Sequence, residues 1–191
     1  MGTAPARVIV EEGLRAISVA CGAVHTAIVM DSGDLFTWGK GGRGQLGHSD
    51  KQDQRLPKRV ESTEWRSGLG VRVVACGTHH TAAVTSDGSV FTFGAGDATQ
   101  LGHGPGRAPA EDTALTEVSW LRGRSIVSCA ASTQHTAVVL ADGTLHTFGD
   151  SDPGRLGRQA AEEEFGASVP GVVMHTAFGC RVRSVACNGH I

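Results

Sequence analysis

Apolar and polar positions along this chain follow one pattern that recurs every 55 residues. Each copy begins with a His-Thr-Ala triplet, at His25, His80 and His135, and continues into a short apolar run. A polar turn follows, and then a second apolar run that ends in an aromatic residue and glycine. Nine of the 24 positions from His25 to His48 hold one residue type in all three copies. A fixed period of this length predicts a repeat protein, in which copies of one small unit stack on each other.

The apolar runs of each copy predict β-strands. Residues 16–21 and 71–76 alternate apolar and small side chains. The run 26–30 is almost continuously apolar but too short for a helix, which is typical of a strand buried on both faces. The Asp-Gly pairs at 87–88 and 142–143 predict two-residue hairpin turns with positive φ, so the next apolar run of each copy is the return strand.

The more variable stretch that ends each copy predicts a fourth, outer strand and a long surface loop. No stretch shows a sustained 3.6-residue pattern, so we expect little helix. Three or four antiparallel strands per unit, repeated radially, are typical of a β-propeller blade. The sequence therefore predicts an all-β fold, a partial β-propeller of about three and a half repeats of 55 residues.

We expect residues 1–191 to form one repeat domain. Its units span approximately residues 16–70, 71–125 and 126–180, with an incomplete fourth unit at 181–191. Three complete units with ragged ends indicate either a fragment of a larger ring or a subunit that closes its ring by oligomerising. An open arc would leave sheet faces and edges uncovered, so self-association through the open propeller edges is expected.

The motifs within each copy resemble the regulator of chromosome condensation repeat family. Ala-Cys-Gly, His-Thr, a turn glycine, aromatic-Gly and Gln-Leu-Gly-His follow one another from Ala20 to His48 and again from Ala75 to His103. The resemblance covers almost the whole chain and implies a fragment of a seven-bladed propeller. Members of that family range from guanine-nucleotide exchange factors for Ran-type GTPases to protein-binding and ubiquitin-ligase-targeting modules and photoreceptors. The resemblance therefore implies a fold and leaves the function open.

The third and fourth copies depart from the family pattern. Ser132 stands where glycine is expected, Arg155 replaces glutamine, and Arg158 replaces histidine. In the fourth copy Cys187 and His190 are one residue too close, so its match to the repeat fades.

Residues that recur with the period are assigned to the structure of the unit, and function is sought where the copies differ. The structural repeat positions are Cys21, Gly22, His25, Gly33, Trp38, Gly39, Gly47, Cys76, Gly77, His80, Gly88, Phe93, Gly94, Gly102, His135, Gly143, Phe148, Gly149 and Gly157.

Net charge and cysteine content limit the compartments and the classes of partner that we expect. The net charge of -2 gives no electrostatic reason to expect nucleic acid or an anionic membrane as partner. Five widely spaced cysteines and no secretory segment predict a reducing compartment, so we expect an intracellular protein, cytoplasmic or nuclear. No apolar run approaches the ~18 residues of a membrane span.

Several motifs suggest chemistry, and each has a structural alternative. The periodic histidines suggest a metal or proton-transfer array, but their recurrence favours hydrogen bonds that fix an inner strand. Cys76 and His79 have zinc-ligand spacing without a second pair. The loop from Gly39 to Gly47 is glycine-rich but lacks the Lys-Ser/Thr of a phosphate loop. We therefore expect no catalytic residue, no metal and no cofactor.

The favoured function is a protein-protein interaction module without intrinsic catalysis, which binds another protein through loops on one face of the propeller. The alternative, implied by the family resemblance alone, is guanine-nucleotide exchange on a Ran-like small GTPase. The candidate partner-binding residues stand where the copies differ. They are Lys40, Arg43, Asp97, Asp152 and Arg155.

Overall fold

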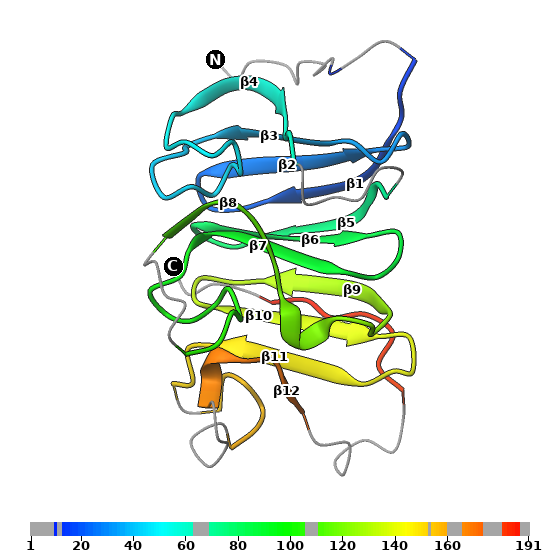
Figure 1. Cartoon of the computed structure of the whole chain (residues 1–191), viewed down its shortest axis with the longest axis vertical. Helices are drawn as coiled ribbons and strands as arrows, with labels where there is room; N and C mark the ends of the chain where they lie inside the picture. Colours follow the sequence, from blue (N-terminus) through cyan, green and yellow to red (C-terminus); the bar gives the residue numbers. More distant parts are fainter. Residues whose placement is uncertain are drawn as a thin grey trace, which may run out of the picture.

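The computed structural model shows three four-stranded antiparallel sheets stacked along the long axis of the molecule (Figure 1). The residues that the structure describes are 10, 13–62, 69–105, 111–152, 154–159, 166–173 and 181–187. The first sheet contains β1 (Ala16–Cys21), β2 (His25–Met30), β3 (Leu35–Gly39) and β4 (Gln54–Arg59). The second contains β5 (Val71–Cys76), β6 (His80–Thr85), β7 (Val90–Ala95) and β8 (Glu111–Glu117). The third contains β9 (Ile126–Ala131), β10 (His135–Leu140), β11 (Leu145–Gly149) and β12 (Gly171–Val172).

Each sheet has its strands in sequence order and repeats the register of the sheet before it. His25 pairs with Gly39 between β2 and β3, and His80 pairs with Gly94 between β6 and β7. His135 likewise pairs with the glycine that ends β11. The predicted four-stranded unit and the partial β-propeller are confirmed.

Helix is nearly absent from the described part of the chain, as the sequence predicts. The described residues contain two short 3₁₀ turns, η1 (Ser119–Leu121) and η3 (Gly166–Ser168). Within the described ranges, no helix has the length and apolar character needed to cross a membrane.

The hairpin turns differ from the two-residue turns that the sequence predicts. In the first, the N–H of Gly33 donates to the carbonyl of Met30 at 2.9 Å, and the N–H of Met30 donates to the carbonyl of Asp34 at 2.9 Å. The loop therefore holds three residues. Gly33, Gly88 and Gly143 have φ of 86°, 87° and 89°, whereas the aspartates before the last two are not in the left-handed region. One glycine after a turn of ordinary hand gives the bulged hairpin, so the predicted turn type is wrong.

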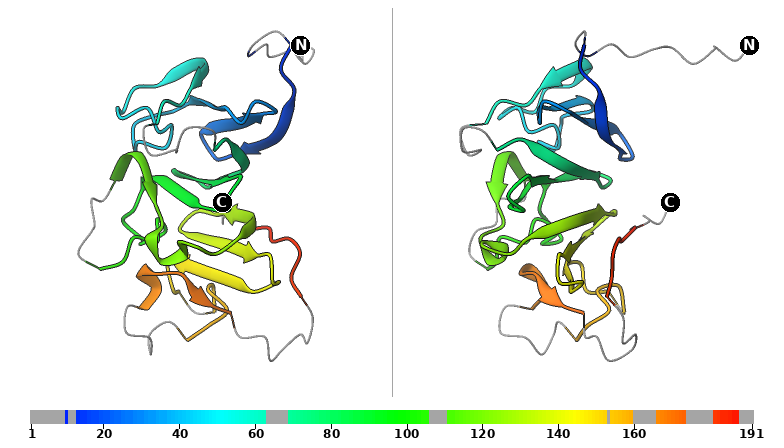
Figure 2. Two further views of the ribbon diagram at one scale, coloured as in Figure 1. Left: turned by 45° about the vertical axis from the view of Figure 1, so that its right-hand side comes forward. Right: turned by 90° about the vertical axis from the view of Figure 1, so that its right-hand side faces the viewer.

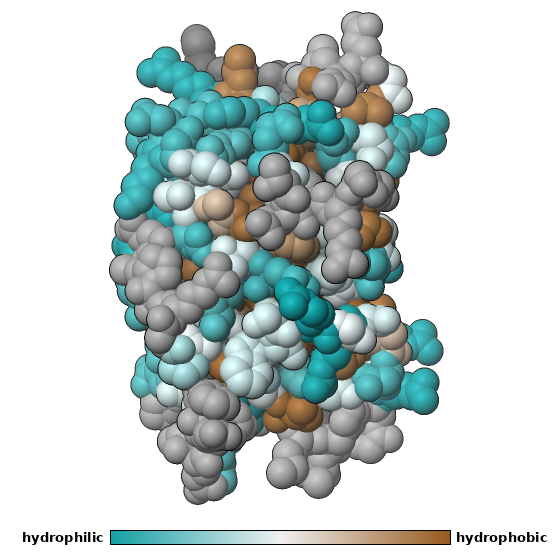
Figure 3. All heavy atoms as spheres, in the orientation of Figure 1, coloured by the Kyte–Doolittle hydropathy of each residue, from teal (hydrophilic) through white to brown (hydrophobic). Residues whose placement is uncertain are grey.

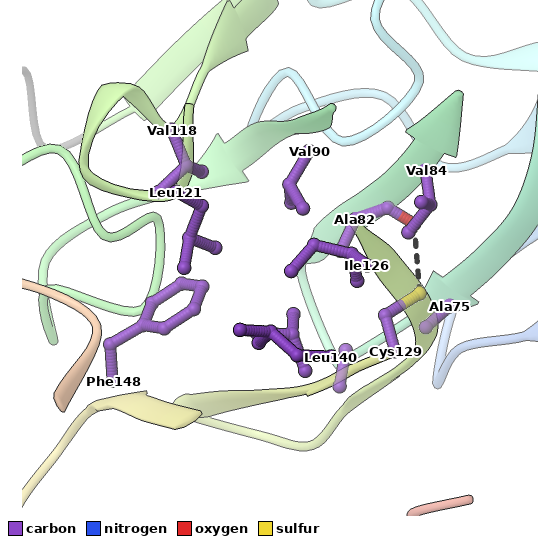
Figure 4. Packing of buried hydrophobic residues seen from close by; sticks show 12 residues of the cluster. Ala75, Ala82, Val84, Val90, Val118, Leu121, Ile126, Cys129, Leu140 and Phe148 are labelled. Atoms are coloured by element: carbon purple, nitrogen blue, oxygen red, sulfur yellow. Dashed lines mark hydrogen bonds between the residues drawn. The ribbon is translucent and has the colours of Figure 1, made fainter. Parts of the chain in front are cut away.

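The core lies in two layers between the three sheets. Between the second and third sheets, Val84 and Val90 face Ile126, Leu140 and their neighbours (Figure 4). A matching layer, between the first and second sheets, contains Ala27 and Val29 opposite Phe91 and Phe93. The second sheet is covered on both faces, and every residue of β6 and β7 is buried. The sequence prediction of strands buried on both faces is confirmed for this sheet.

In the second and third sheets, the aromatic residue before Gly packs against the Leu-Gly motif of the preceding copy. A Cβ on Gly47 would lie 2.9 Å from the ring of Phe93, and one on Gly102 would lie 2.7 Å from the ring of Phe148. Both glycines also have φ of 72°. Glycine is required at these positions by conformation and by space, and Phe93 and Phe148 are 0% exposed beneath them.

Residues 182–187 lie where the first strand of a fourth sheet would lie. The N–H of Val182 donates to the carbonyl of Gly143 at 3.1 Å. The same bond starts the second sheet, from Val71 to Gly33, at 2.8 Å. The spacing between the bonded residues is one residue longer in the fourth copy, so an extra residue precedes Val182. This departure is separate from the short spacing between Cys187 and His190. This segment runs beside the third sheet (red in Figure 2), while His190 lies outside the described residues.

Candidate partner-binding face

The loops that follow β3 and β7 leave the same side of the stack and carry most of the predicted partner-binding residues (Figure 1). The loop after β11 is their counterpart in the third sheet and carries the rest. Hydrophilic side chains gather along this left-hand side of the molecule (Figure 3). All five predicted residues lie in these three loops, and the structure shows which of them meet.

Lys40 is paired within its own loop. Its Nζ lies 2.8 Å from Oδ2 of Asp53, and the N–H of Gly41 donates to Oδ1 of the same carboxylate at 3.0 Å. The lysine hydrogen bond, helped by the backbone N–H, holds the pKa of Asp53 below its usual value. Asp53 thus fixes the start of the loop, although the sequence analysis does not identify it.

Arg43 and Asp97 connect the loops of the first two sheets. One guanidinium nitrogen of Arg43 donates to Oδ1 of Asp97 at 3.0 Å. The backbone N–H of Arg43 donates to the side-chain carbonyl of Gln45 at 2.8 Å, which sets the curve of its loop. The sequence prediction placed both charged residues on one face, and the structure brings them together.

Arg155 and Asp152 form a second group, in the loop of the third sheet. Arg155 pairs with Asp150 at short range and with Asp152 at 3.5 Å, and it donates to the side-chain oxygen of Gln134 at 3.3 Å. In the other two copies the position of Arg155 is a buried glutamine. Asp150 and Gln134 are absent from the sequence prediction. The sequence could have identified them, because each differs from the residues at the equivalent positions of the other two copies.

This surface is charged but nearly balanced. It carries three basic side chains and four carboxylates, and the exposed fractions of their side chains range from 26% for Arg155 to 68% for Lys40. Exposed ion pairs of this kind contribute about 0–1 kcal/mol each to stability. Their arrangement is therefore suited to directional contacts with another polar surface rather than to holding the fold.

Behind this face, a hydrogen-bond relay joins each sheet to the next. Nε2 of His25 lies 2.8 Å from Oγ1 of Thr81, whose hydroxyl donates to the carbonyl of Gln45 at 2.8 Å. Since the threonine hydrogen is used on the carbonyl, Nε2 of the imidazole is the donor. We call this set of three groups a latch. A second latch joins the next pair of sheets through His80 and Thr136, at 2.9 Å.

The latch histidines are neutral. Burial, with a smaller repulsion from His79, lowers the pKa of His25 to about 4. Burial, followed by repulsion from His25, lowers the pKa of His80 to about 3. Their Nδ1 atoms are buried without a hydrogen-bond partner. Such rings are poorly suited to transfer protons near neutral pH, so the latches hold the sheets together.

The third copy replaces this arrangement. Ser132 takes the place of glycine, and its Oγ lies 2.5 Å from Nδ1 of His135. The backbone N–H of His135 donates to the same oxygen at 3.3 Å, and the serine hydroxyl donates to the carbonyl of His135 at 3.4 Å. Within the described ranges, no threonine closes this latch, and His135 is only partly buried.

The remaining chemical alternatives find no supporting geometry. Burial raises the pKa of Cys76 and of Cys129 to about 12, which suppresses their nucleophilic thiolate forms. The glycine-rich loop packs by Gly44 against the backbone at Thr113 and leads into no helix. Across the described residues, no group of three or more histidine, cysteine, aspartate or glutamate side chains could hold a metal ion.

Comparison with known proteins identifies the family. The profile described as "Regulator of chromosome condensation (RCC1) repeat" matches residues 32–84 and 87–139, and a second profile of that description matches 16–45 and 71–100. The chain belongs to the regulator of chromosome condensation repeat family.

Curated relatives of this repeat chain are much longer than the chain itself. The human E3 ubiquitin-protein ligase HERC2 is 32% identical over 199 residues, which cover 76% of this chain and 4% of HERC2. The Arabidopsis thaliana ultraviolet-B receptor UVR8 is 36% identical over 154 residues, which cover 80% of this chain and 33% of UVR8. The chain thus spans a third or less of these relatives.

Solved structures show the same fold. Human WBSCR16 superposes with a TM-score of 0.78 at 23% identity, over 92% of this chain and 42% of that one. Prp20p from Saccharomyces cerevisiae superposes with a TM-score of 0.70 at 22% identity, over 84% of this chain and 38% of Prp20p. At these identities the likeness bears on the fold alone.

Proposed function

We propose that this chain is a single repeat domain that acts as a protein-protein interaction module without catalysis of its own. The observation that carries the proposal is the gathering of charged residues, at positions where the copies differ, on loops along one side of a rigid sheet stack. Rigid scaffolds with variable loops are a common basis for binding sites. The relatives support a protein partner, since HERC2 is a ubiquitin ligase and the study of Prp20p names Gsp1p and histones as its binding partners.

The internal repeat supplies variants that test this face with little effect on the fold. Each candidate can be replaced by the residue at the equivalent position of another copy: Arg43→Ala as in Ala98, Asp97→Gly as in Gly42, and Arg155→Gln as in Gln100. We expect the triple variant to keep the melting temperature of the wild type. We also expect it to lose at least tenfold in affinity for partners captured by the wild-type protein, about 1.4 kcal/mol or more.

A matched control removes a charge elsewhere. Arg122 is exposed and pairs with Glu117 at the outer strand of the second sheet. Arg122→Gln should leave every affinity unchanged. Equal losses in the control and the triple variant, or no loss in either, would remove the loop face from consideration.

Guanine-nucleotide exchange on a Ran-like GTPase is the alternative, supported only by family membership and by the fold that the chain shares with Prp20p. A Ran-type GTPase loaded with fluorescent GDP separates the two functions. We expect its rate of GDP release to be unchanged by this chain. An accelerated release that the triple variant abolishes would replace the proposal with exchange activity.

Self-association is a further part of the proposed role. The expected route is through open propeller edges, and the first sheet has apolar side chains that no other part of the described structure covers. Ile17, Val19 and Val24 are 53%, 65% and 37% exposed. Exposed apolar side chains of this size often mark a protein interface.

A further inference from the structure

Consecutive loops of the candidate partner-binding face carry equivalent residues whose charges differ between the two steps of the stack. From the first sheet to the second, Arg43 pairs with Asp97 at 3.0 Å. One repeat later, the equivalent residues are Ala98 and Asp152. We call Arg43 and Asp97 the closed step, and Ala98 and Asp152 the open step. The open step keeps the carboxylate, but alanine takes the place of the arginine.

The loop backbone has the same shape at both steps. The N–H of Arg43 donates to the side-chain oxygen of Gln45 at 2.8 Å. The N–H of Ala98 donates to the side-chain oxygen of Gln100, also at 2.8 Å. The side chains at positions 43 and 98 therefore leave equivalent points of the backbone in the same direction.

The sheets beneath the loops are also stacked in the same way. The hydroxyl of Thr81 donates to the carbonyl of Gln45 at 2.8 Å. The hydroxyl of Thr136 donates to the carbonyl of Gln100 at the same distance. The inner ends of the two loops are thus held at the same height above the next sheet.

A second contact, farther out, repeats as well. The N–H of Ser49 donates to the carbonyl of Thr113 at 2.9 Å. One repeat later, the N–H of Gly104 donates to the carbonyl of Ser168 at 3.0 Å. With the loops held alike at two points, a guanidinium placed beyond Ala98 would lie within reach of the carboxylate of Asp152.

The open step has an excess of negative charge. Asp152 has a side chain that is 65% exposed and lies 3.5 Å from Arg155, which pairs more closely with Asp150. Among these described residues, two carboxylates share one guanidinium. The closed step has one carboxylate for one guanidinium. A further cation is therefore attracted to the open step.

We propose that the open step binds an arginine side chain of the protein partner, in the place that Arg43 takes at the closed step. This inference rests on the proposed function and adds the chemistry of one contact. Arginine suits the site better than lysine, because its planar guanidinium can donate two hydrogen bonds to one carboxylate. Close charge pairs within a protein interface contribute more than exposed pairs, because the partner excludes water from them.

Ala98→Arg tests whether the open step accepts a guanidinium. We expect this variant to raise the melting temperature by about 1–2 °C, because the new side chain pairs with Asp152. In a double-mutant cycle, Asp152→Asn should cancel the increase. An increase that persists without the carboxylate would show that arginine at position 98 does not reach Asp152, and would overturn the proposal.

A short peptide with one arginine among glycines and serines is the probe for binding. Titrated into isotope-labelled protein at low salt, it should shift the amide resonances of Ala98 and Asp152 in a saturable way. Asp152→Asn and Ala98→Arg should each weaken this binding about threefold or more, while a glutamine version of the peptide should not bind. Arg43→Ala should create a second site at Asp97, because it turns the closed step into an open one.

The matched control removes a carboxylate elsewhere. Glu61 is exposed and follows β4, near the end of the sheet that carries the hairpin turn. Glu61→Gln should leave the affinity for the arginine peptide unchanged. If it weakened binding as much as Asp152→Asn does, the peptide would be responding to net charge, and the open step would not be its site.

Two further results would overturn the proposal. They are the absence of a saturable shift at Asp152 in the wild type and the absence of a second site in Arg43→Ala. If the triple variant of the loop face still lost its partners, the proposed function would stand without this contact. Peptide binding combined with unchanged partner affinity in the triple variant would instead overturn the proposed function, and with it the partner's arginine as the occupant.

Discussion

Two layers on the same side of the sheet stack differ in almost every property. The latches of His25 and His80 recur with the repeat, lie between sheets and are closed by uncharged hydrogen bonds. The loops in front of them carry charged residues at positions where the copies differ, such as Asp97, which pairs with Arg43, and Arg155, which pairs with Asp150. The repeat was copied with its buried contacts, while its exposed loops diverged. Substitutions in the inner layer should therefore change stability, and those in the outer layer should change binding.

The largest effect is expected at Gly77. A Cβ there would lie 2.2 Å from the carbonyl oxygen of Ser132 and 2.4 Å from the ring of His80. Both neighbours belong to the latch region, and the first is backbone, so neither can move without separating the sheets. We expect Gly77→Ala to lower the free energy of unfolding by about 5 kcal/mol or to prevent folding. Urea unfolding followed by circular dichroism measures this loss.

Gly42→Ala is the control in the outer layer. No atom lies within 4 Å of a Cβ at that loop position. Its free energy of unfolding should stay within about 0.5 kcal/mol of the wild type. If Gly77→Ala were equally harmless, close contact between the sheets would not be what fixes glycine at this position.

Acid should weaken the inner layer next most strongly. The pKa values of His25 and His80, about 4 and about 3 in the folded chain, lie below the ordinary histidine value of about 6.5. The unfolded chain then binds more protons than the folded chain below that value. Stability is complete above about pH 6.5 and is lost as the pH falls toward the folded pKa values. At about pH 5 each ring should have lowered the free energy of unfolding by about 2 kcal/mol.

The pH dependence is measured by urea unfolding at intervals from about pH 8 to about pH 5. A free energy of unfolding that stays constant over this window would mean that the imidazoles are not buried as neutral rings. The exposed ion pairs of the loops should contribute little to the slope, because their carboxylates stay ionised in both states there.

The next largest loss of stability is expected from removing a latch histidine, and it should be larger where a threonine completes the latch. His80→Ala removes a fully buried ring and the donor to Thr136, so we expect a loss of about 3 kcal/mol. His135→Ala removes a partly buried ring whose latch has no threonine in the described structure, so we expect about 1 kcal/mol. Equal losses at the two positions, measured by thermal unfolding, would contradict the assignment of the latch.

The fold was accessible from the sequence because its information is local and repeated three times. Apolar runs such as 80–85 predict both the strand positions and a sheet covered on both faces, because an almost continuously apolar strand must be buried on both sides. The turn type was missed, since the Asp-Gly pair alone does not distinguish a two-residue turn from a three-residue turn with one left-handed glycine at Gly88.

The candidate face was accessible only in part. Non-recurrence identified Lys40, Arg43 and Asp97, but the sequence does not reveal that Arg43 meets Asp97, since the two residues belong to different loops. Their contact depends on how the sheets stack. The latch was foreseen as hydrogen bonding by His-Thr pairs, yet its partner is the threonine of the next copy, a contact that spacing within one copy cannot show.

The smallest change in stability is expected within the loops, at a position where one copy has threonine and the other two have glycine. Thr99 has φ of 57°, in the left-handed region that β-branched residues adopt only with strain. Glycine stands at the equivalent positions, where Gly44 and Gly154 have φ of 78° and 82°. Thr99→Gly should therefore raise the free energy of unfolding by about 1 kcal/mol, since relief of strain exceeds the added entropy of the unfolded chain. It should leave partner affinity unchanged. A melting temperature below that of the wild type would show that the threonine side chain makes contacts that outweigh its strain.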